Sequence, residues 1–222
     1  MTELVPTPQG PGRLLVDAAA QPHALLLLGH GAGGGPDAPD LAALARWLPV
    51  LGVTVLRFEQ PWRLAGRRVA VAPPRLDEAW LVAADQLAAG GWAGPPLWTG
   101  GRSAGARVAC RTATRLGAAG VVCLAFPLHP PGRPDRSRAA ELLAPLVPRL
   151  VLQGERDAFG PGEEVRAAVG QDQGVTVVDL PGADHAFATP ARAVPGAAAL
   201  RERVVAEVAR FLAPGTADGA RE

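Results

Sequence analysis

The sequence LWTGGRSAGAR, residues 97–107, runs from an apolar stretch through the pattern Gly-x-Ser-x-Gly into residues with helical spacing. A strand, this pattern and a helix in that order are typical of a nucleophile elbow, a sharp turn that exposes a serine hydroxyl. Because this hydroxyl is a poor nucleophile at neutral pH, it needs a base beside it. Gly101 and Gly105 would permit a turn that a Cβ obstructs. A glycine-rich turn without chemistry is the alternative.

The length and charge of the chain indicate one domain and no preference for a polyionic partner. Its 222 residues, of which 48% are hydrophobic, suffice for a single core. Lys and Arg number 22 against 21 Asp and Glu, which gives a net charge of +1. Such a balance predicts neither a basic stripe for nucleic acid nor an acidic tail. We therefore expect a small-molecule ligand and no nucleic-acid partner, and a homodimer stays open.

Nothing in the sequence predicts export or membrane insertion. The apolar run at residues 24–28 is too short to span a bilayer and follows no basic leader. Cys110 and Cys123 fall in an expected helix and an expected strand, where buried free thiols are common, and do not suggest a disulfide framework. The prediction is a cytoplasmic protein without membrane contact.

Short apolar runs alternate along the chain with longer stretches of helical period. This alternation predicts an α/β fold, a single domain over residues 1–222 with a mostly parallel sheet and helices on both faces. Segments 1–11 and 214–222 are rich in Pro, Gly and polar residues, so we expect them to be flexible. The predicted strands are 13–16, 24–28, 53–58, 97–99, 121–125, 150–152 and 175–180, and the predicted helices are 40–51, 76–89, 104–116, 139–146, 163–169 and 197–212.

Reactive groups in an open parallel sheet gather at the carboxyl ends of the strands. Asp157 follows the predicted strand 150–152, and His185 follows the last predicted strand, 175–180. The order Ser103, Asp157, His185 is the chain order of the α/β-hydrolase triad. In that arrangement the histidine takes the serine proton and later returns it, while the carboxylate orients the ring. These three residues are the predicted catalytic residues.

Other histidines and carboxylates compete for these roles. His129 also follows a strand, but only His185 follows the last one, so His129 is kept as a candidate for substrate binding. His23 and His30 are interpreted as structural hydrogen-bonding residues.

Two acidic residues close to the predicted pair are weaker candidates. Glu155 is an alternative to Asp157, although the turn at residues 154–157 favours the later residue. Asp184 is adjacent to His185 in the chain and poorly placed to reach its ring, so we expect a cap or a surface position.

The glycine-rich sequence LGHGAGGG, residues 28–35, comes directly after a predicted strand. In an acyl-transfer enzyme such a loop directs a backbone N–H at the developing oxyanion. We predict Ala32, with Gly33 as its neighbour, as one donor of an oxyanion hole and Ala104 as the second.

The same loop also satisfies the pattern Gly-x-Gly-x-x-Gly, with Glu59 after the next strand, where a ribose-binding acid is expected. That fingerprint needs a helix that begins within the glycines, whereas PDAP intervenes at residues 36–39. A nicotinamide dinucleotide-binding protein is therefore the less favoured alternative. No His-x-x-x-His or Cys-x-x-Cys spacing suggests a metal site. We expect neither a cofactor nor a metal.

Longer motifs spread over most of the chain carry a family resemblance. They are residues 30–34, 57–62, 100–107, 126–136, 154–160 and 182–187. Together they resemble the small α/β-hydrolases grouped with dienelactone hydrolases, in the branch that includes a testis-expressed protein and the hydrolase-like domain of a subunit of the NSL acetyltransferase complex. FPLHPPG at residues 126–132 is the most specific of them. The resemblance implies an α/β-hydrolase fold with Ser103, Asp157 and His185 at its triad positions, and it implies no particular substrate.

The segment 126–149 is short, whereas many hydrolases of this fold carry a long insertion there. We expect minimal or no lid and a pocket suited to small or loosely held acyl groups. Arg102 is a candidate to bind a carboxylate-bearing substrate, and packing of its stem is the alternative. Arg133, Arg136 and Arg138 are expected in a solvated loop, and a rim that binds anions is the alternative.

These observations predict a serine hydrolase that cleaves a small carboxylic ester or thioester through an acyl-enzyme on Ser103. The elbow, the glycine loop and the order of the three residues support this function. A hydrolase-fold interaction module with little or no turnover is the alternative from a different class.

Overall fold

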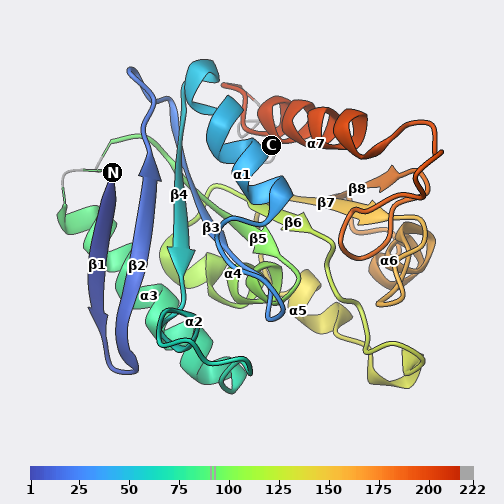
Figure 1. Ribbon diagram of the computed structural model, residues 1–222, viewed down its shortest axis with the longest axis horizontal. Coiled ribbons are helices and arrows are strands. Elements are labelled where there is room, and N and C mark those ends of the chain that lie inside the picture. The colour runs from blue at the N-terminus through green and yellow to red at the C-terminus, as the bar shows by residue number, and fades with distance from the viewer. Residues whose placement is uncertain (91, 93, 216–222) are drawn as a thin grey trace.

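Eight strands form one sheet in the computed structural model, which describes residues 1–90, 92 and 94–215 (Figure 1). The strands are β1 Thr2–Thr7, β2 Gly10–Asp17, β3 Ala24–Gly29, β4 Val53–Glu59, β5 Leu97–Arg102, β6 Val121–Leu124, β7 Arg149–Gly154 and β8 Val175–Leu180. Their order across the sheet is β1-β2-β4-β3-β5-β6-β7-β8. The strand that leads into Ser103, β5, therefore lies at the centre of the sheet.

The sheet is parallel from β4 to β8 and antiparallel only where β2 pairs with β1 and with β4. β3, β6 and β7 are buried along their whole length, as expected for parallel strands covered on both faces. Because the central strands run in one direction, their carboxyl ends share one edge, and the parallel register sets Gly29 of β3 beside Gly101 of β5.

Helices cover both faces of the sheet. α1 and α7 pack on one face, and α3, α4, α5 and α6 pack on the other (Figure 1). A short helix, α2, follows β4. The helices are α1 Pro39–Trp47, α2 Pro61–Leu64, α3 Pro73–Ala89, α4 Ala104–Leu116, α5 Ala139–Leu143, α6 Gly162–Val169 and α7 Ala197–Phe211.

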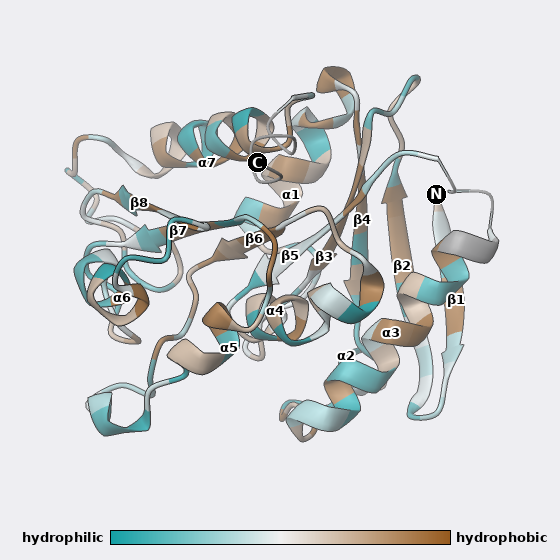
Figure 2. Ribbon diagram, turned by 180° about the vertical axis from the view of Figure 1, so that it is seen from behind, coloured by the Kyte–Doolittle hydropathy of each residue, from teal (hydrophilic) through white to brown (hydrophobic). Residues whose placement is uncertain are grey.

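The apolar residues of the sheet and the inner sides of the helices form two core layers, one on each face (Figure 2). The layer under α3 and α4 contains Trp80 and Phe58, whose ring centroids lie 6.3 Å apart in an edge-to-face arrangement. Full burial of one large apolar side chain contributes about 1.5–3 kcal/mol. These layers hold β5 and α4, and with them the turn between them, in one place.

The predicted α/β architecture is confirmed, and the ends of two helices differ for a local reason. The predicted helix 40–51 ends as an α-helix at Trp47 and continues as a 3-10 turn, Pro49–Leu51. The predicted helix 139–146 ends at Leu143. In each case a proline follows, at residue 49 or residue 145, and proline lacks the N–H that the next hydrogen bond of the α-helix requires.

The first eleven residues differ most from the prediction. We expected a flexible segment, but Thr2–Thr7 forms β1 and pairs with β2. The turn is closed by Gly10, which has φ 101°, and by Thr7 Oγ1, which donates to the Gly10 carbonyl at 2.7 Å. Val5 is fully buried. Most of the other predicted flexible segment, residues 216–222 of 214–222, lies outside the described residues.

Both cysteines are buried free thiols in the core, as predicted, and their sulfur atoms lie 3.5 Å apart. Within the described parts of the chain, we find no helix with the length and apolar character that a membrane span requires.

Candidate active site

Ser103 occupies a strained turn between β5 and α4. Its backbone has φ 51° and ψ −109°, which L-residues rarely adopt and which costs about 1–3 kcal/mol. The Ser103 N–H donates to the carbonyl of Leu124 at 2.9 Å, which anchors the turn to β6. The turn lifts the hydroxyl above the carboxyl end of the central strand.

Gly101 and Gly105 are required by a close approach of two backbones. A Cβ at Gly101 would lie 2.4 Å from the carbonyl oxygen of Gly29, and a Cβ at Gly105 would lie 2.2 Å from the same atom. Neither distance is possible for a real side chain, so α4 packs against β3 only because both positions lack one. The steric role predicted for these glycines is confirmed.

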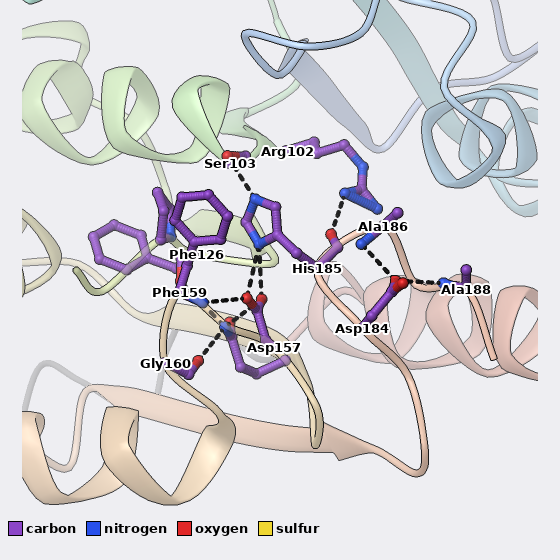
Figure 3. Close-up of polar contacts among 12 residues, drawn as sticks. Arg102, Ser103, Phe126, Asp157, Phe159, Gly160, Asp184, His185, Ala186 and Ala188 are labelled. Carbon is purple, nitrogen blue, oxygen red and sulfur yellow. Dashed lines mark hydrogen bonds and ion pairs between the residues drawn. The ribbon is translucent and has the colours of Figure 1, made fainter. Parts of the chain in front are cut away.

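The structure brings the three predicted catalytic side chains together (Figure 3). His185 Nε2 lies 2.9 Å from Ser103 Oγ, and His185 Nδ1 lies 2.8 Å and 3.0 Å from the two carboxylate oxygens of Asp157. With the Nδ1 proton donated to the carboxylate, Nε2 is the nitrogen that accepts from the hydroxyl. The Asp157 side chain is 0% exposed, and that of His185 is 24% exposed.

The carboxylate of Asp157 is held by the end of β7 and by the loop that follows it. The Phe159 N–H donates to Oδ1 at 2.8 Å, and Gln153 Nε2 donates to Oδ2 at 2.9 Å. The Phe159 ring also stacks on the imidazole of His185, with ring centroids 4.1 Å apart (Figure 3). These contacts set the orientation of both the carboxylate and the ring.

Arg102 joins the elbow to α1 and to the loop that carries His185. Its Nε donates to both carboxylate oxygens of Asp40, at 2.9 Å and 3.1 Å, and its Nη1 donates to the His185 carbonyl at 2.7 Å. Its guanidinium lies 4.8 Å from the centre of the Phe187 ring. Arg102 lines the cavity beside Ser103, yet these donors already have partners, and substrate binding by Arg102 stays a prediction.

The two weaker acidic candidates have other partners. Asp184 Oδ1 accepts from the N–H groups of Ala186 and Ala188, so it caps the loop next to His185. Glu155 accepts from the N–H of Gly182 at 2.8 Å.

His30 connects the glycine loop after β3 to Gln60, the residue that follows β4. Its Nδ1 lies 2.9 Å from the Gly31 carbonyl, and its Nε2 accepts from the N–H of Gln60 at 3.1 Å. Burial lowers the pKa of His30, which favours the neutral ring that these two hydrogen bonds require. The structural role predicted for His30 agrees with these contacts. α1 begins at Pro39, beyond the glycines, so the loop lacks the helix start that a dinucleotide fingerprint needs.

The candidate oxyanion-hole residues lie on the cavity wall beside Ser103. Ala32 and Gly33 of the glycine loop and Ala104 all line it. Ala104 is the first residue of α4, where backbone N–H groups have no acceptor within the helix. Their role as oxyanion donors stays a prediction.

The cavity at this edge has a volume of about 610 Å³ and contains Ser103 and His185 in its wall. That size is within the range of small-molecule sites. The segment between β6 and β7, which contributes Pro127 and Arg138 to the wall, contains only a 3-10 turn, Pro134–Arg136, and the short helix α5. A helical lid is therefore absent from this described segment, in agreement with the prediction.

His129 is paired with partners other than the serine. Its Nε2 lies 2.7 Å from Glu164, and its Nδ1 lies 2.9 Å from the Pro130 carbonyl. The hydrogen bond to the Pro130 carbonyl raises the pKa of His129, and the hydrogen bond to Glu164 adds to this effect. The described lining of the cavity does not include His129, and substrate binding by this residue stays a prediction.

Sequence reasoning missed three residues that support the site: Asp40, Gln153 and Phe159. Gln153 was detectable, because a polar residue at the end of the apolar strand β7 has to find hydrogen-bond partners when it is buried. Asp40 and Phe159 gave no signal, since their partners are distant in the sequence or lie across the site.

Comparison with known proteins identifies the class that this fold and site define. Residues 22–213 match the family described as alpha/beta hydrolase domain. The chain therefore belongs to the alpha/beta hydrolase family. Its resemblance to the dienelactone-hydrolase-like branch stays a prediction, and a comparison with curated proteins gives no match.

Solved structures with the same fold include a serine hydrolase, a serine hydrolase homologue and an esterase domain. An α/β serine hydrolase of Xanthomonas campestris, described as lacking a lid, is 24% identical, with 97% of this chain and 96% of that chain covered and a TM-score of 0.72. An α/β serine hydrolase homologue of Coxiella burnetii is 22% identical, with 94% and 97% covered and a TM-score of 0.76. The esterase domain of a Rhodothermus marinus protein is 18% identical, with 96% and 99% covered and a TM-score of 0.68. At these identities, the likeness shows the shared fold.

Proposed function

We propose that the protein is a serine hydrolase that cleaves a small carboxylic ester or thioester through an acyl-enzyme on Ser103. The observation that carries the proposal is the contact of Ser103 Oγ with His185 Nε2 at 2.9 Å, while Nδ1 of the same ring faces the buried Asp157. Membership of the alpha/beta hydrolase family supports it.

In the acylation step, Ser103 Oγ attacks the carbonyl carbon of the substrate as its proton passes to His185 Nε2. The carbonyl oxygen becomes an oxyanion, and His185 then gives the proton to the departing alcohol or thiol as the bond to the carbonyl carbon breaks. Water repeats the sequence on the acyl-enzyme and releases the carboxylic acid and free Ser103. Asp157 keeps the proton on Nδ1 and stabilises the imidazolium that forms twice in the cycle.

The oxyanion is bound by backbone N–H groups of Ala104 and of Ala32 or Gly33. Loss of one donor of this kind typically costs about 3 kcal/mol in the transition state. Because the donors are backbone groups, substitutions at these positions act through the shape of the loop.

The absence of a lid from the described segment over the site supports a small or loosely held acyl group, since no element encloses a long chain. We further propose a cytoplasmic protein that acts on soluble small molecules without a cofactor, a nucleic-acid partner or membrane contact.

A fluorophosphonate probe tests the nucleophile. We expect labelling of the wild type and none of Ser103→Ala, together with hydrolysis in a panel of acyl esters and thioesters that falls by several orders of magnitude in the same variant. Ser137, the second serine of the chain, is exposed, and Ser137→Ala is the matched control that should keep both signals. A correctly folded wild type that takes no label would favour an interaction module over an enzyme.

A further inference from the structure

The described wall of the cavity beside Ser103 carries cationic side chains and no acidic ones. Three arginines line it, Arg102, Arg107 and Arg138, and none of its described lining residues is acidic. The carboxylates that pair with two of these arginines, Asp40 and Glu141, are outside the described lining. A ligand in the cavity therefore meets guanidinium groups.

Arg107 shares its carboxylate partner, Glu141, with Arg111. Arg107 donates to both oxygens of Glu141, at 2.8 Å and 2.6 Å, and Arg111 donates to the same carboxylate at 2.7 Å. Although burial opposes it, the hydrogen bonds and charges of these two arginines lower the pKa of Glu141. Glu141 is thus already shared between two cations.

Arg138 is the arginine without a carboxylate of its own. Among the described residues, none carries a carboxylate within ion-pair distance of it, and its Nη1 donates to the Pro127 carbonyl at 3.0 Å. The side chain is half-buried, and burial, followed by the charge of Arg107, lowers its pKa, although the charge of Glu141 opposes this. Glu141 is paired with Arg107 and Arg111, and the described cavity wall offers this partly desolvated cation no carboxylate.

The other arginines of this segment behave differently. Arg133 is exposed and pairs with Asp135 at 3.2 Å, and Arg136 is also exposed. The described cavity wall includes neither of them. The prediction of a solvated loop therefore fits Arg133 and Arg136, whereas Arg138 lines the cavity.

We infer that Arg138, with Arg107 beside it, binds a carboxylate of the substrate. The inference rests on the proposed function and narrows it: the substrate is an ester or thioester that carries a carboxylate besides the bond that is cleaved. A guanidinium presents a planar fork of donors that matches a carboxylate in two parallel hydrogen bonds. The carboxylate belongs either to the acyl chain or to the leaving group.

Two matched substrate pairs distinguish these sources. On the acyl side, p-nitrophenyl hexanoate is compared with mono-p-nitrophenyl adipate, which replaces the terminal methyl by a carboxylate. On the leaving-group side, the hexanoyl ester of 4-hydroxybenzoate is compared with that of its methyl ester. We expect a higher kcat/KM for the anionic member of one pair. In Arg138→Gln this preference should fall about 10- to 100-fold, as expected for a lost hydrogen-bonded charge pair.

Arg133→Gln is the control, because it removes an exposed arginine of the same segment and should leave the preference unchanged. The neutral substrates report damage to the loop, since Arg138 also holds the Pro127 carbonyl. Equal losses for neutral and anionic substrates in Arg138→Gln, or no anionic preference in the wild type, would overturn the inference while the esterase proposal stands. A rate that Ser103→Ala does not change would overturn both.

Discussion

His185 and His129 each follow a strand at the carboxyl edge of the sheet, and each pairs with a carboxylate. His185 uses Nδ1 for Asp157 and turns Nε2 to the hydroxyl of Ser103. His129 uses Nδ1 for a backbone carbonyl and Nε2 for Glu164. Only the first ring has a nitrogen directed at a group that must lose a proton.

The two carboxylates also differ in their surroundings. Asp157 is 0% exposed and receives two further hydrogen bonds, whereas the Glu164 side chain is 49% exposed. A buried, oriented carboxylate stabilises an imidazolium strongly, because solvent does not screen the pair. In the proposed mechanism, an acidic partner alone therefore does not make a histidine a base, because its second nitrogen must also face the serine hydroxyl.

Among the expected effects, the difference in kcat between the His185→Ala and His129→Ala variants should be the largest. We expect His185→Ala to lower kcat by about 10⁶-fold, since loss of the base removes the activated nucleophile. His129→Ala should change it by less than about 10-fold, because both ring nitrogens are already bonded to Pro130 and Glu164 and His129 is not among the described lining residues of the cavity. Steady-state hydrolysis of an ester from the panel measures both. Comparable losses in the two variants would break the distinction.

The next largest difference in kcat should separate the Asp157→Asn and Glu164→Gln variants. Asp157→Asn keeps the shape but favours the wrong tautomer of His185, so we expect a loss of about 10⁴-fold in kcat. Glu164→Gln should cost no more than a few-fold. Fluorophosphonate labelling rates, measured beside kcat, report whether the serine itself has lost its reactivity. A mild Asp157→Asn phenotype would remove that residue from the mechanism.

The smallest expected effect is on stability, and it belongs to His129. Because the folded state raises the pKa of His129, the charged ring contributes stability that is fully present below the unfolded pKa of about 6.5 and is lost as pH rises through the folded pKa. Melting temperatures of wild type and His129→Gln, measured between about pH 5 and pH 9, should therefore converge toward high pH. A difference that is constant with pH would show that the ring contributes by packing alone.

The local features of the site were predictable because they depend on neighbours in the sequence. α4 occurs at the predicted residues 104–116, and the requirement for Gly101 and Gly105 followed from the turn that they flank. The three residues that the chain order pointed to, Ser103, Asp157 and His185, lie in contact in the structure, and their catalytic roles stay a prediction. By contrast, β1 escaped prediction, since an edge strand that contains a proline is stabilised by its partner β2 rather than by its own composition.

Residue types, their periodicity and their order along the chain are properties of the sequence, and they determined the α/β class, the elbow and the candidate acid, base and nucleophile. Only the tertiary structure decided which donors already have partners: Arg102 faces Asp40 across the fold, His129 faces Glu164, and Arg138 faces the cavity. The physical reason is the range of the interactions. Helical and strand periods act over a few residues, whereas an ion pair or a proton transfer depends on distances that the packing of the helices on the sheet sets.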